Sequence, residues 1–391
     1  MITVAEALAR LFALVEPLGA EEVPVERAAG RVLARDAVAG RDQPPFPASA
    51  MDGYAVAAAE AAPGARFRVV GEAAAGRRFA GRIGPGEAVR IFTGAPLPEG
   101  ADRVVIQEDT AREGEAVTLL DSLGAGPHVR PAGADFRAGD RLAAPRRLSP
   151  ADVALLAAMN LPRVAVARRP EVAILSTGDE LVLPGEDPGP DQIIASNAYG
   201  LKALLEALGA EARLLPVARD TEASLRAGFE LADGADLVLT VGGASVGDHD
   251  LVGPVAAELG MEQAFYKVAM RPGKPLMAGR LGQAAMIGLP GNPVSAIVCG
   301  HVFVAPVIRK MLGLGEAPAP RRQAPLARAV AANGPREHYM RARLTPEGLQ
   351  PFDSQDSALL SVLAEADALL VRPVSDGPRA AGEVVDYVPL A

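Results

Sequence analysis

Cysteine is nearly absent from this chain, and its scarcity excludes a disulfide-stabilised fold. Cys299 is the single cysteine among 391 residues, so no disulfide can form within one chain. It lies in an apolar stretch, where a thiol behaves as a small hydrophobic side chain. We therefore expect Cys299 to be buried in a protein of a reducing compartment, the cytoplasm.

Long apolar runs are also missing. No apolar run reaches the roughly twenty residues that a helix needs to cross a bilayer. The first residues, from Met1 to Glu6, have neither the basic nor the apolar segment of a signal peptide. The sequence therefore predicts a cytoplasmic protein without a membrane partner.

Positive charge is scarce and scattered. The formal net charge is −9, and basic residues form no run, so nucleic acid is not an expected partner. Lysine is especially rare and occurs only as Lys202, Lys267, Lys274 and Lys310. Two of these, Lys267 and Lys274, fall within one short stretch.

The chain is too long for one typical hydrophobic core. Its 391 residues predict about two to four domains. Over 41–140, short β-type runs alternate with glycine and proline turns, as in a small all-β module. From Glu171, strands alternate with helices, and repeated βα units predict a doubly wound, mostly parallel sheet. After a proline-rich linker near Pro318, the tail is again β-type, and we see no catalytic constellation in it.

Hydrophobic periodicity predicts the individual elements. Thr3 and Glu6 form a capping box for a helix over 3–18, and Ser149 caps another. Further helices are expected over 197–208, 222–232 and 294–310. Strands are expected over 171–176, 213–218, 236–241, 265–268 and 284–287, and in the tail over 339–344, 349–352, 368–371 and 383–388.

The loop after strand 236–241 is the most informative stretch. It combines a glycine pair with a hydroxyl and two carboxylates, contributed by Gly242, Gly243, Ser245, Gly247, Asp248 and Asp250. Adjacent glycines let the backbone approach a ligand and expose its N–H groups. Carboxylates suit Mg²⁺ that also binds substrate phosphate. The alternative is a glycine-rich turn in which Asp250 caps the next helix.

Three more polar loops follow expected strands, over 177–180, 220–221 and 288–293. Ligands bind at the carboxyl ends of the strands in sheets of this kind. We therefore expect these loops to converge with the glycine loop on one site.

A basic loop over 267–275 carries Lys267, Arg271 and Lys274 beside Gly273. Lysine acts as a point charge toward oxyanions such as phosphate or molybdate, and arginine as a planar fork. The alternative is a solvated basic loop. The scarcity of lysine elsewhere favours an anion site.

Three loops of the β module are unusually polar, over 47–54, 90–96 and 130–136. They carry Asp52, Thr93 and Asp135. Asp-Gly and Thr-Gly are ordinary turn pairs, so turn chemistry is the alternative explanation for each loop.

Glycine loop, carboxylates and basic loop together indicate metal-assisted chemistry on a phosphorylated, anionic substrate. The sequence also resembles the molybdopterin molybdenumtransferases, the molybdenum insertases of the MoeA and gephyrin E-domain type. The resemblance covers almost the whole chain. Six motifs carry it: SAMDGYA at 49–55, FTGAP at 92–96, STGDEL at 176–181, GGASVGD at 242–248, RPGKP at 271–275 and GLPGNPVS at 288–295. Ala244 stands where the family usually has a larger aliphatic residue, and Arg271 where some members have lysine.

This resemblance implies insertion of molybdate into adenylylated molybdopterin, with release of AMP and a need for Mg²⁺. The implied metal ligands are Glu180, Asp220 and Asp250, which form the catalytic set together with Asp52 and Thr93. The implied substrate-binding residues are Gly242, Gly243, Ser245, Gly247, Asp248, Lys267, Arg271, Lys274, Asp135, Pro290, Pro293 and Ser295. Dithiolene sulfurs of the pterin supply the soft ligands for molybdenum, so the protein need not supply them, and its single cysteine is consistent with this.

The resemblance also implies an elongated subunit of four domains. These are a helical linking domain over 1–40 and 141–170, with helix 3–18 expected to pack on the α/β domain, the β module over 41–140, an α/β molybdopterin-binding domain over 171–316, and a C-terminal β domain over 317–391. The family is a homodimer, and we expect the β module of one subunit to complete the site of the other. Other molybdenum cofactor enzymes are further candidate partners.

Two other functions remain open at this stage. A molybdopterin adenylyltransferase would use a related α/β domain, but the inserted β module and the C-terminal β domain argue against it. A non-catalytic scaffold of gephyrin type is disfavoured because every polar motif is present.

Overall fold

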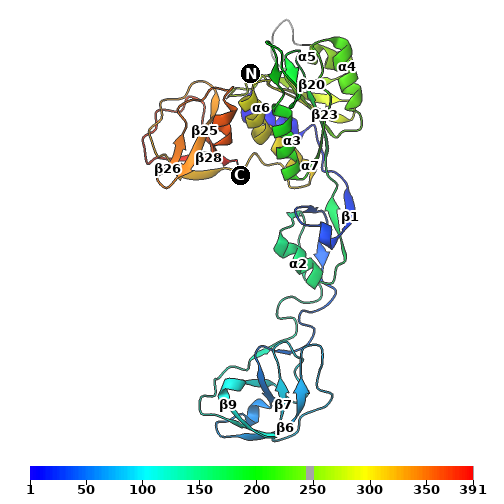
Figure 1. Cartoon of the computed structure of the whole chain (residues 1–391), viewed down its shortest axis with the longest axis vertical. Helices are drawn as coiled ribbons and strands as arrows, with labels where there is room; N and C mark the ends of the chain where they lie inside the picture. The colour runs from blue at the N-terminus through cyan, green and yellow to red at the C-terminus, as the bar shows by residue number, and fades with distance from the viewer. Residues whose placement is uncertain (244–250, 391) are drawn as a thin grey trace. The chain divides into compact units, whose positions relative to one another are not determined.

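The structure is a computed structural model that describes residues 1–243 and 251–390. The chain divides into two compact units (Figure 1). The first unit comprises 1–21, 30–34 and 166–391, and the second comprises 22–29 and 35–165. The finer division into four domains stays a prediction.

The first unit is built on a six-stranded sheet in the order β18-β15-β19-β23-β22-β20. Four neighbouring strands pair in parallel, while β22 runs antiparallel to both of its neighbours. The mostly parallel sheet predicted from the βα pattern is thus confirmed. Its strands are β15 (Glu171–Ser176), β18 (Glu211–Leu214), β19 (Leu237–Val241), β20 (Glu262–Tyr266), β22 (Met277–Leu281) and β23 (Ala284–Leu289).

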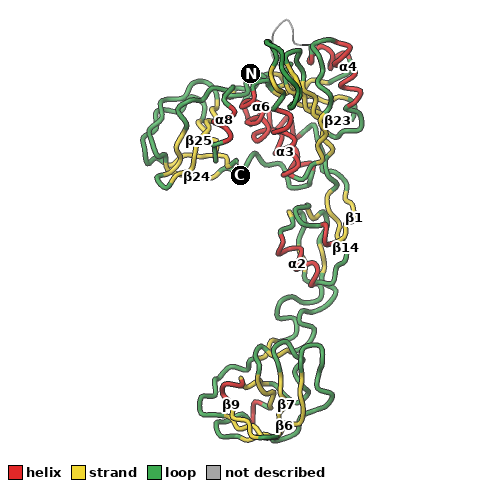
Figure 2. The backbone as a smooth tube through the Cα atoms, viewed as in Figure 1, coloured by secondary structure: helices red, strands yellow, loops and turns green. Residues whose placement is uncertain are grey.

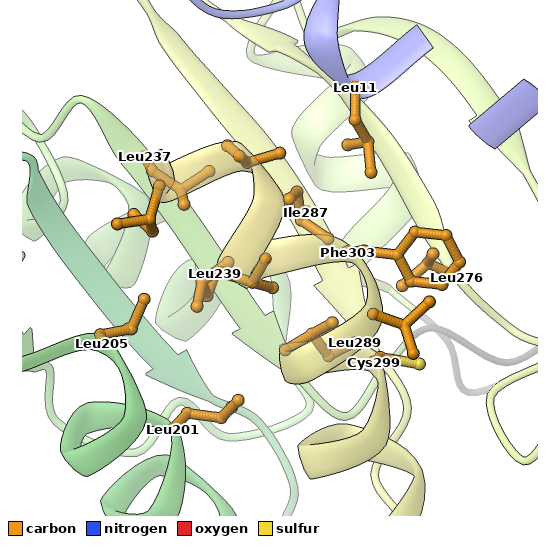
Figure 3. Close-up of a cluster of buried hydrophobic side chains, with 14 of the residues drawn as sticks. Leu11, Leu201, Leu205, Leu237, Leu239, Leu276, Ile287, Leu289, Cys299 and Phe303 are labelled. Atoms are coloured by element: carbon orange, nitrogen blue, oxygen red, sulfur yellow. The ribbon is translucent and has the colours of Figure 1, made fainter. Parts of the chain in front are cut away.

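Helices cover both faces of this sheet. Strand side chains on one face pack in a hydrophobic cluster with helices α1, α3, α6 and α7 (Figure 3), and the opposite face packs against α4 and α5. In Figure 3, Leu201 and Leu205 from α3 lie on the same side of the sheet as Leu11 from α1. The helices are α1 (Val4–Phe12), α3 (Asn197–Leu208), α4 (Glu222–Leu231), α5 (Val252–Glu258), α6 (Pro293–Cys299) and α7 (Ala305–Met311).

One helix prediction was wrong in extent, and another helix has the predicted extent but an irregular turn. The first helix ends at Phe12 rather than residue 18, although its Thr3–Glu6 capping box is present. Beyond it the chain turns, so that Val15 is buried and the Leu18 N–H donates to the Met311 carbonyl. The helix predicted over 294–310 contains a π-helical turn, Gly300–Val304, between α6 and α7. Local periodicity cannot show either change, because both depend on tertiary packing.

Strand boundaries also shifted. The strands predicted over 213–218 and 265–268 begin earlier, at Glu211 and Glu262, and β22 was not predicted. Its sequence, Met-Ala-Gly-Arg-Leu, shows neither clear alternation nor β-branched side chains. The strand is defined by its pairing with β20 and β23, and its local sequence does not indicate it.

One helical stretch, Pro293–Met311, is long and apolar enough to cross a membrane, contrary to the expectation that no apolar run is long enough. Its most apolar window is 83% buried inside the protein, as expected for a core helix. The cytoplasmic location stays a prediction.

The C-terminal part of the first unit is a second sheet, in the order β21-β25-β27-β28-β24, with β26 paired to β25. The predicted hairpin over 339–352 is present as β25 and β26. The edge strand β21 belongs to the basic loop, and it pairs Met270 with Glu337 and Arg271 with His338. The strands are β21 (Met270–Arg271), β24 (Arg322–Pro325), β25 (Glu337–Thr345), β26 (Gly348–Pro351), β27 (Ala368–Arg372) and β28 (Val384–Pro389), with the short helix α8 (Leu360–Ala364).

The second unit contains a β module, as its turn-rich sequence predicted (Figure 2). Its sheet has the order β8-β5-β7-β6-β10-β9 and separates two hydrophobic clusters. The strands are β5 (Gly53–Val56), β6 (Arg66–Ala73), β7 (Glu87–Ile91), β8 (Arg103–Ile106), β9 (Thr110–Glu113) and β10 (Ala116–Leu119). Two pairs of short strands adjoin it: β3 (Ala37–Val38) with β12 (Arg141–Leu142), and β4 (Ala48–Ser49) with β11 (Val129–Arg130).

A small four-stranded sheet flanks helix α2 (Pro150–Ala158), whose N-terminus has the predicted Ser149–Asp152 capping box. Its order is β1-β14-β2-β13, with strands β1 (Ala20–Pro24), β14 (Arg163–Ala167), β2 (Val32–Leu33) and β13 (Arg146–Arg147).

Candidate active site

A cavity of about 710 Å³ lies at the carboxyl ends of β15, β19 and β23. Parallel strands place the loops that follow them at one edge of the sheet, which is why these loops meet. Glu180, Asp220, Gly242, Gly243, Pro290 and Pro293 line this cavity, together with Ser176, Thr177, Ile193, Asn197 and Asn292. We call it the carboxylate cavity.

The Glu180 carboxylate folds back over Gly178. A Cβ added at Gly178, whose φ is +148°, would lie 2.3 Å from Glu180 Oε2. A side chain at residue 178 would therefore push Glu180 out of the position in which it lines the cavity.

Asp220 is held by reciprocal hydrogen bonds with Asp179. The Asp220 N–H donates to Asp179 Oδ1 at 3.2 Å, and the Asp179 N–H donates to Asp220 Oδ2 at 3.4 Å. The neighbouring Arg219 donates to the Asp179 carbonyl at 2.8 Å. These bonds join the loops after β15 and β18 and keep Asp220 half-buried at the cavity wall.

The glycine pair that follows β19 is packed tightly against the loop after β15. A Cβ at Gly242, whose φ is +95°, would lie 2.6 Å from the Thr177 carbonyl oxygen and 3.0 Å from Thr177 Oγ1. The Gly242 N–H donates to the Leu289 carbonyl at 3.1 Å. These contacts explain why the first residue of the pair is glycine.

Thr177 itself carries an unsatisfied hydroxyl. The residue is 3% exposed, and its Oγ1 has no hydrogen-bond partner among the described residues. Thr240 on β19 has the same property, but it does not line the cavity.

A second cavity of about 420 Å³ lies beside the first. The two share Pro275 and Asn292 in their walls. Arg271, Lys274 and Arg336 contribute three cationic side chains, whereas Asp356 contributes one carboxylate. We call it the cation cavity. Pro272, Gly273, Ser295, Gln355 and Ser357 complete its lining.

The C-terminal part of the chain, for which no catalytic constellation was predicted, supplies part of the lining of the cation cavity. Arg336 precedes β25, and Gln355, Asp356 and Ser357 belong to the loop between β26 and α8. The pairing of Arg271 with His338 brings β21 alongside β25, where Arg336 lies. The run Ser-Gln-Asp-Ser at 354–357 was the available signal, since a polar cluster in a short loop is a candidate for binding.

Lys267 lines neither cavity. It has a φ of +69°, and its Nζ lies 5.0 Å from the centre of the Tyr266 ring. Of the three cations predicted as an anion-binding set, the structure thus brings Arg271 and Lys274 together and leaves Lys267 apart.

The polar residues of the β module lie in the second unit. The Asp52 carboxylate accepts hydrogen bonds from the backbone N–H and the hydroxyl of Thr93, each at 2.8 Å. These two bonds lower the pKa of Asp52, and the nearby Arg90 adds to the effect. Asp135 is exposed on a separate loop. Asp52 and Thr93, which were predicted as site residues on two different loops, therefore contact each other, an arrangement that turn chemistry also explains.

Several predicted residues fall outside the described residues, namely Ser245, Gly247, Asp248 and Asp250. Within the part of the chain that the structure describes, His, Cys, Asp and Glu side chains form no group of three able to hold a metal ion. Glu180 and Asp220 nevertheless face one cavity, and Mg²⁺ usually takes one or two protein carboxylates together with substrate phosphates. The donor set of these two residues therefore fits Mg²⁺.

The chain is similar to known proteins over almost its whole length. Residues 2–160 match the MoeA N-terminal region (domain I and II), residues 173–310 a probable molybdopterin binding domain, and residues 323–390 the MoeA C-terminal region (domain IV). The molybdopterin molybdenumtransferase of Nostoc sp. is 38% identical over 94% of this chain and 88% of its own length. That of Haemophilus influenzae is 34% identical over 100% and 98%.

Solved structures agree with this assignment. A crystal structure of the molybdopterin biosynthesis MoeA protein from Pyrococcus horikoshii superposes with a TM-score of 0.85 at 32% identity, covering 100% of this chain and 99% of that one. The chain therefore belongs to the molybdopterin molybdenumtransferase family.

Proposed function

We propose that this chain inserts molybdate into adenylylated molybdopterin and releases AMP, in a reaction that depends on Mg²⁺. The observation that carries this proposal is the pair of adjacent cavities, one lined by carboxylates and one by cations, with Pro275 and Asn292 in both walls. Two anionic substrates repel each other. Adjacent sites of opposite charge can hold both, one through a bound cation and the other directly.

The carboxylate cavity is the proposed site for the phosphate end of the pterin substrate. Glu180 and Asp220 would hold Mg²⁺, which when bound neutralises and polarises the phosphate groups. Gly242 and Gly243 leave room for a ligand to approach the backbone. Leu181, Ile193 and Ile194 add apolar wall to the same cavity, suited to a ring system.

The cation cavity is the proposed site for molybdate. Lys274 supplies a point charge, while Arg271 and Arg336 supply planar donor forks. Ser295 and Ser357 add hydroxyls. Four oxygens of a tetrahedral oxyanion can therefore all receive hydrogen bonds from this chain.

Among the described residues that line these cavities there is no cysteine or methionine to serve as a soft ligand for molybdenum. Cys299 is fully buried in the hydrophobic core, and burial raises the pKa of its thiol well above the ordinary value. The neutral thiol is a poor metal ligand. The dithiolene sulfurs of the substrate are then the ligands that the metal acquires.

We also propose that the chain acts as a homodimer in which Asp52, Thr93 and Asp135 of one subunit complete the site of the other. The support comes from family resemblance and from the presence of these residues in a unit separate from both cavities. Mixing Asp52→Ala with Asp220→Ala after denaturation and refolding tests it. Shared sites should leave roughly a quarter of all sites intact under random pairing. Recovery near zero, with mixed dimers shown to be present, contradicts sharing.

Turnover tests the proposed reaction. Adenylylated molybdopterin is incubated with the protein, and AMP release and molybdenum cofactor are measured with molybdate and Mg²⁺ each omitted in turn. Both products should require both additions. AMP formation from ATP and molybdopterin would instead identify an adenylyltransferase, and no turnover would favour the scaffold.

A further inference from the structure

Arg341, on β25, is a charged side chain in an unusual environment. It is 1% exposed, so its guanidinium is buried. Burial lowers the pKa of this arginine, partly offset by the attraction of Asp356. No carboxylate forms an ion pair with Arg341 among the described residues. A buried guanidinium without a paired carboxylate must find its partners elsewhere.

Those partners all belong to one loop. Arg341 Nη1 donates to the carbonyls of Asp356 at 2.9 Å and Leu359 at 3.3 Å, and Nη2 donates to the Ser354 carbonyl at 3.5 Å. The Arg341 backbone N–H donates to Gln355 Oε1 at 2.9 Å, and Gln355 Nε2 donates to the Arg341 carbonyl at 3.0 Å. The planar guanidinium thus anchors the loop over 354–359 by its backbone.

The same loop contributes lining residues to both cavities. Gln355, Asp356 and Ser357 line the cation cavity, and Ala358 lines the carboxylate cavity. The Ser357 carbonyl also accepts a hydrogen bond from the Val294 N–H at 3.1 Å, which ties the loop to the start of α6. Figure 2 shows α8, directly after this loop, beside α6.

We infer that Arg341 is a positioning residue for the reaction, which holds the loop over 354–358 in place as a shared wall of the two substrate cavities. The inference rests on the proposed function, because it assigns molybdate to the cation cavity. Arg341 itself lines neither cavity. It acts through Gln355, Asp356 and Ser357.

Arg372 provides a matched control. It is 2% exposed and lies on the neighbouring strand β27 of the same sheet. Its hydrogen bonds go to Asp376 at 2.6 Å, to the Ala331 carbonyl at 3.0 Å and to the Gly377 carbonyl. None of these partners lines either cavity. Loss of either guanidinium fork should weaken the sheet, but only Arg341 should affect the cavities.

The experiment compares Arg341→Lys and Arg372→Lys in the full-length protein. Unfolding temperature, kcat, and the KM for molybdate and for adenylylated molybdopterin are measured for each. We expect a lower unfolding temperature in both variants. A rise of about tenfold in the KM for molybdate is expected in Arg341→Lys alone, since lysine cannot reproduce the several hydrogen bonds of the planar fork.

Three outcomes would overturn the inference. An unchanged KM for molybdate in Arg341→Lys removes the positioning role while leaving the proposed function intact, provided the wild type turns over. An equal rise in Arg372→Lys shows a general effect of sheet stability. If Arg341→Lys and Arg341→Gln both fail to fold where Arg372→Lys folds, Arg341 is a structural residue. Absence of molybdate-dependent turnover in the wild type is the separate failure of the proposed function.

Discussion

Asp179 and Asp220 each accept a hydrogen bond from the other's backbone N–H, at 3.2 Å and 3.4 Å. This reciprocal pair fixes Asp220 at the wall of the carboxylate cavity through acceptor oxygens alone. An amide oxygen accepts in the same way as a carboxylate oxygen. The geometry therefore allows the charge of Asp220 to be removed without loss of the pair.

The first prediction follows from that pair. Asp220→Asn should keep the fold, because the Asn amide oxygen can still accept from Asp179. Turnover should fall by roughly tenfold to a hundredfold, the usual effect of disturbing a metal ligand environment, and the Mg²⁺ concentration needed for half-maximal rate should rise. Turnover against Mg²⁺ and thermal unfolding are the measurements. A drop in stability with an unchanged Mg²⁺ requirement would make Asp220 a purely structural residue.

The second prediction concerns Lys274 in the cation cavity. Lys274→Ala should raise the KM for molybdate by roughly tenfold to a hundredfold, since a hydrogen bond to a charged group contributes roughly 1.5–3 kcal/mol. The KM of the wild type should rise with ionic strength, and that of the variant should rise less steeply. Lys202→Ala is the control, because Lys202 pairs with Glu206 on α3 outside both cavities. Equal KM values for wild type and Lys274→Ala would remove this residue from the oxyanion site.

The third prediction concerns the hydroxyls of Thr177 and Thr240, which find no hydrogen-bond partner in the part of the chain that the structure describes. Valine has nearly the same shape, and removing a buried hydroxyl without a partner costs no hydrogen bond. Thr177→Val and Thr240→Val should therefore leave the free energy of unfolding unchanged or raise it by up to about 1 kcal/mol. Chemical denaturation measures this. A loss in either variant would show that its hydroxyl has a partner in solution.

The fourth prediction is a pH dependence of stability. Burial lowers the pKa of His301 and of His338 to about 4, and for His338 the charges of Arg271, Arg336, Arg372 and Arg341 act in the same direction. Both histidines have a pKa near 6.5 in an unfolded chain, so the unfolded state binds more protons at intermediate pH. Stability should therefore fall as the pH drops from about 6.5 toward 4.

Thermal unfolding at a series of pH values measures this dependence. His338→Gln should show a shallower decline than the wild type over the same range. An identical decline in the variant would show that His338 is not held neutral in the folded protein.

Much of the fold was predictable because its elements carry local signals. The apolar run before Gly242 predicts a strand, and the capping boxes at Thr3 and Ser149 predict helix starts. The structure has all three. Strand β22 has no such signal. It forms because this segment pairs with both β20 and β23 in the sheet.

The residues of the candidate site also differ in whether the sequence could predict them. Glu180, Asp220 and Gly242 follow parallel strands, so a topological rule was enough to expect them at one cavity. Arg336 reaches the cation cavity through pairing of β21 with β25, and the Ser357 carbonyl accepts from the Val294 N–H at 3.1 Å, both contacts between distant parts of the sequence. Arginine is mostly found at protein surfaces, so the sequence gives no reason to expect Arg341 to be buried. Only the tertiary structure shows that it is.

The central claim is that two adjacent cavities hold the two substrates. It is tested most directly by locating molybdate in crystals of the protein. Crystals soaked in molybdate are measured at a wavelength where molybdenum scatters anomalously. The account predicts an anomalous peak in the cation cavity, within hydrogen-bond distance of Lys274 and Arg336, which is absent in Lys274→Ala crystals. A peak beside Glu180 and Asp220 instead, or none in the cation cavity at saturating molybdate, would contradict it.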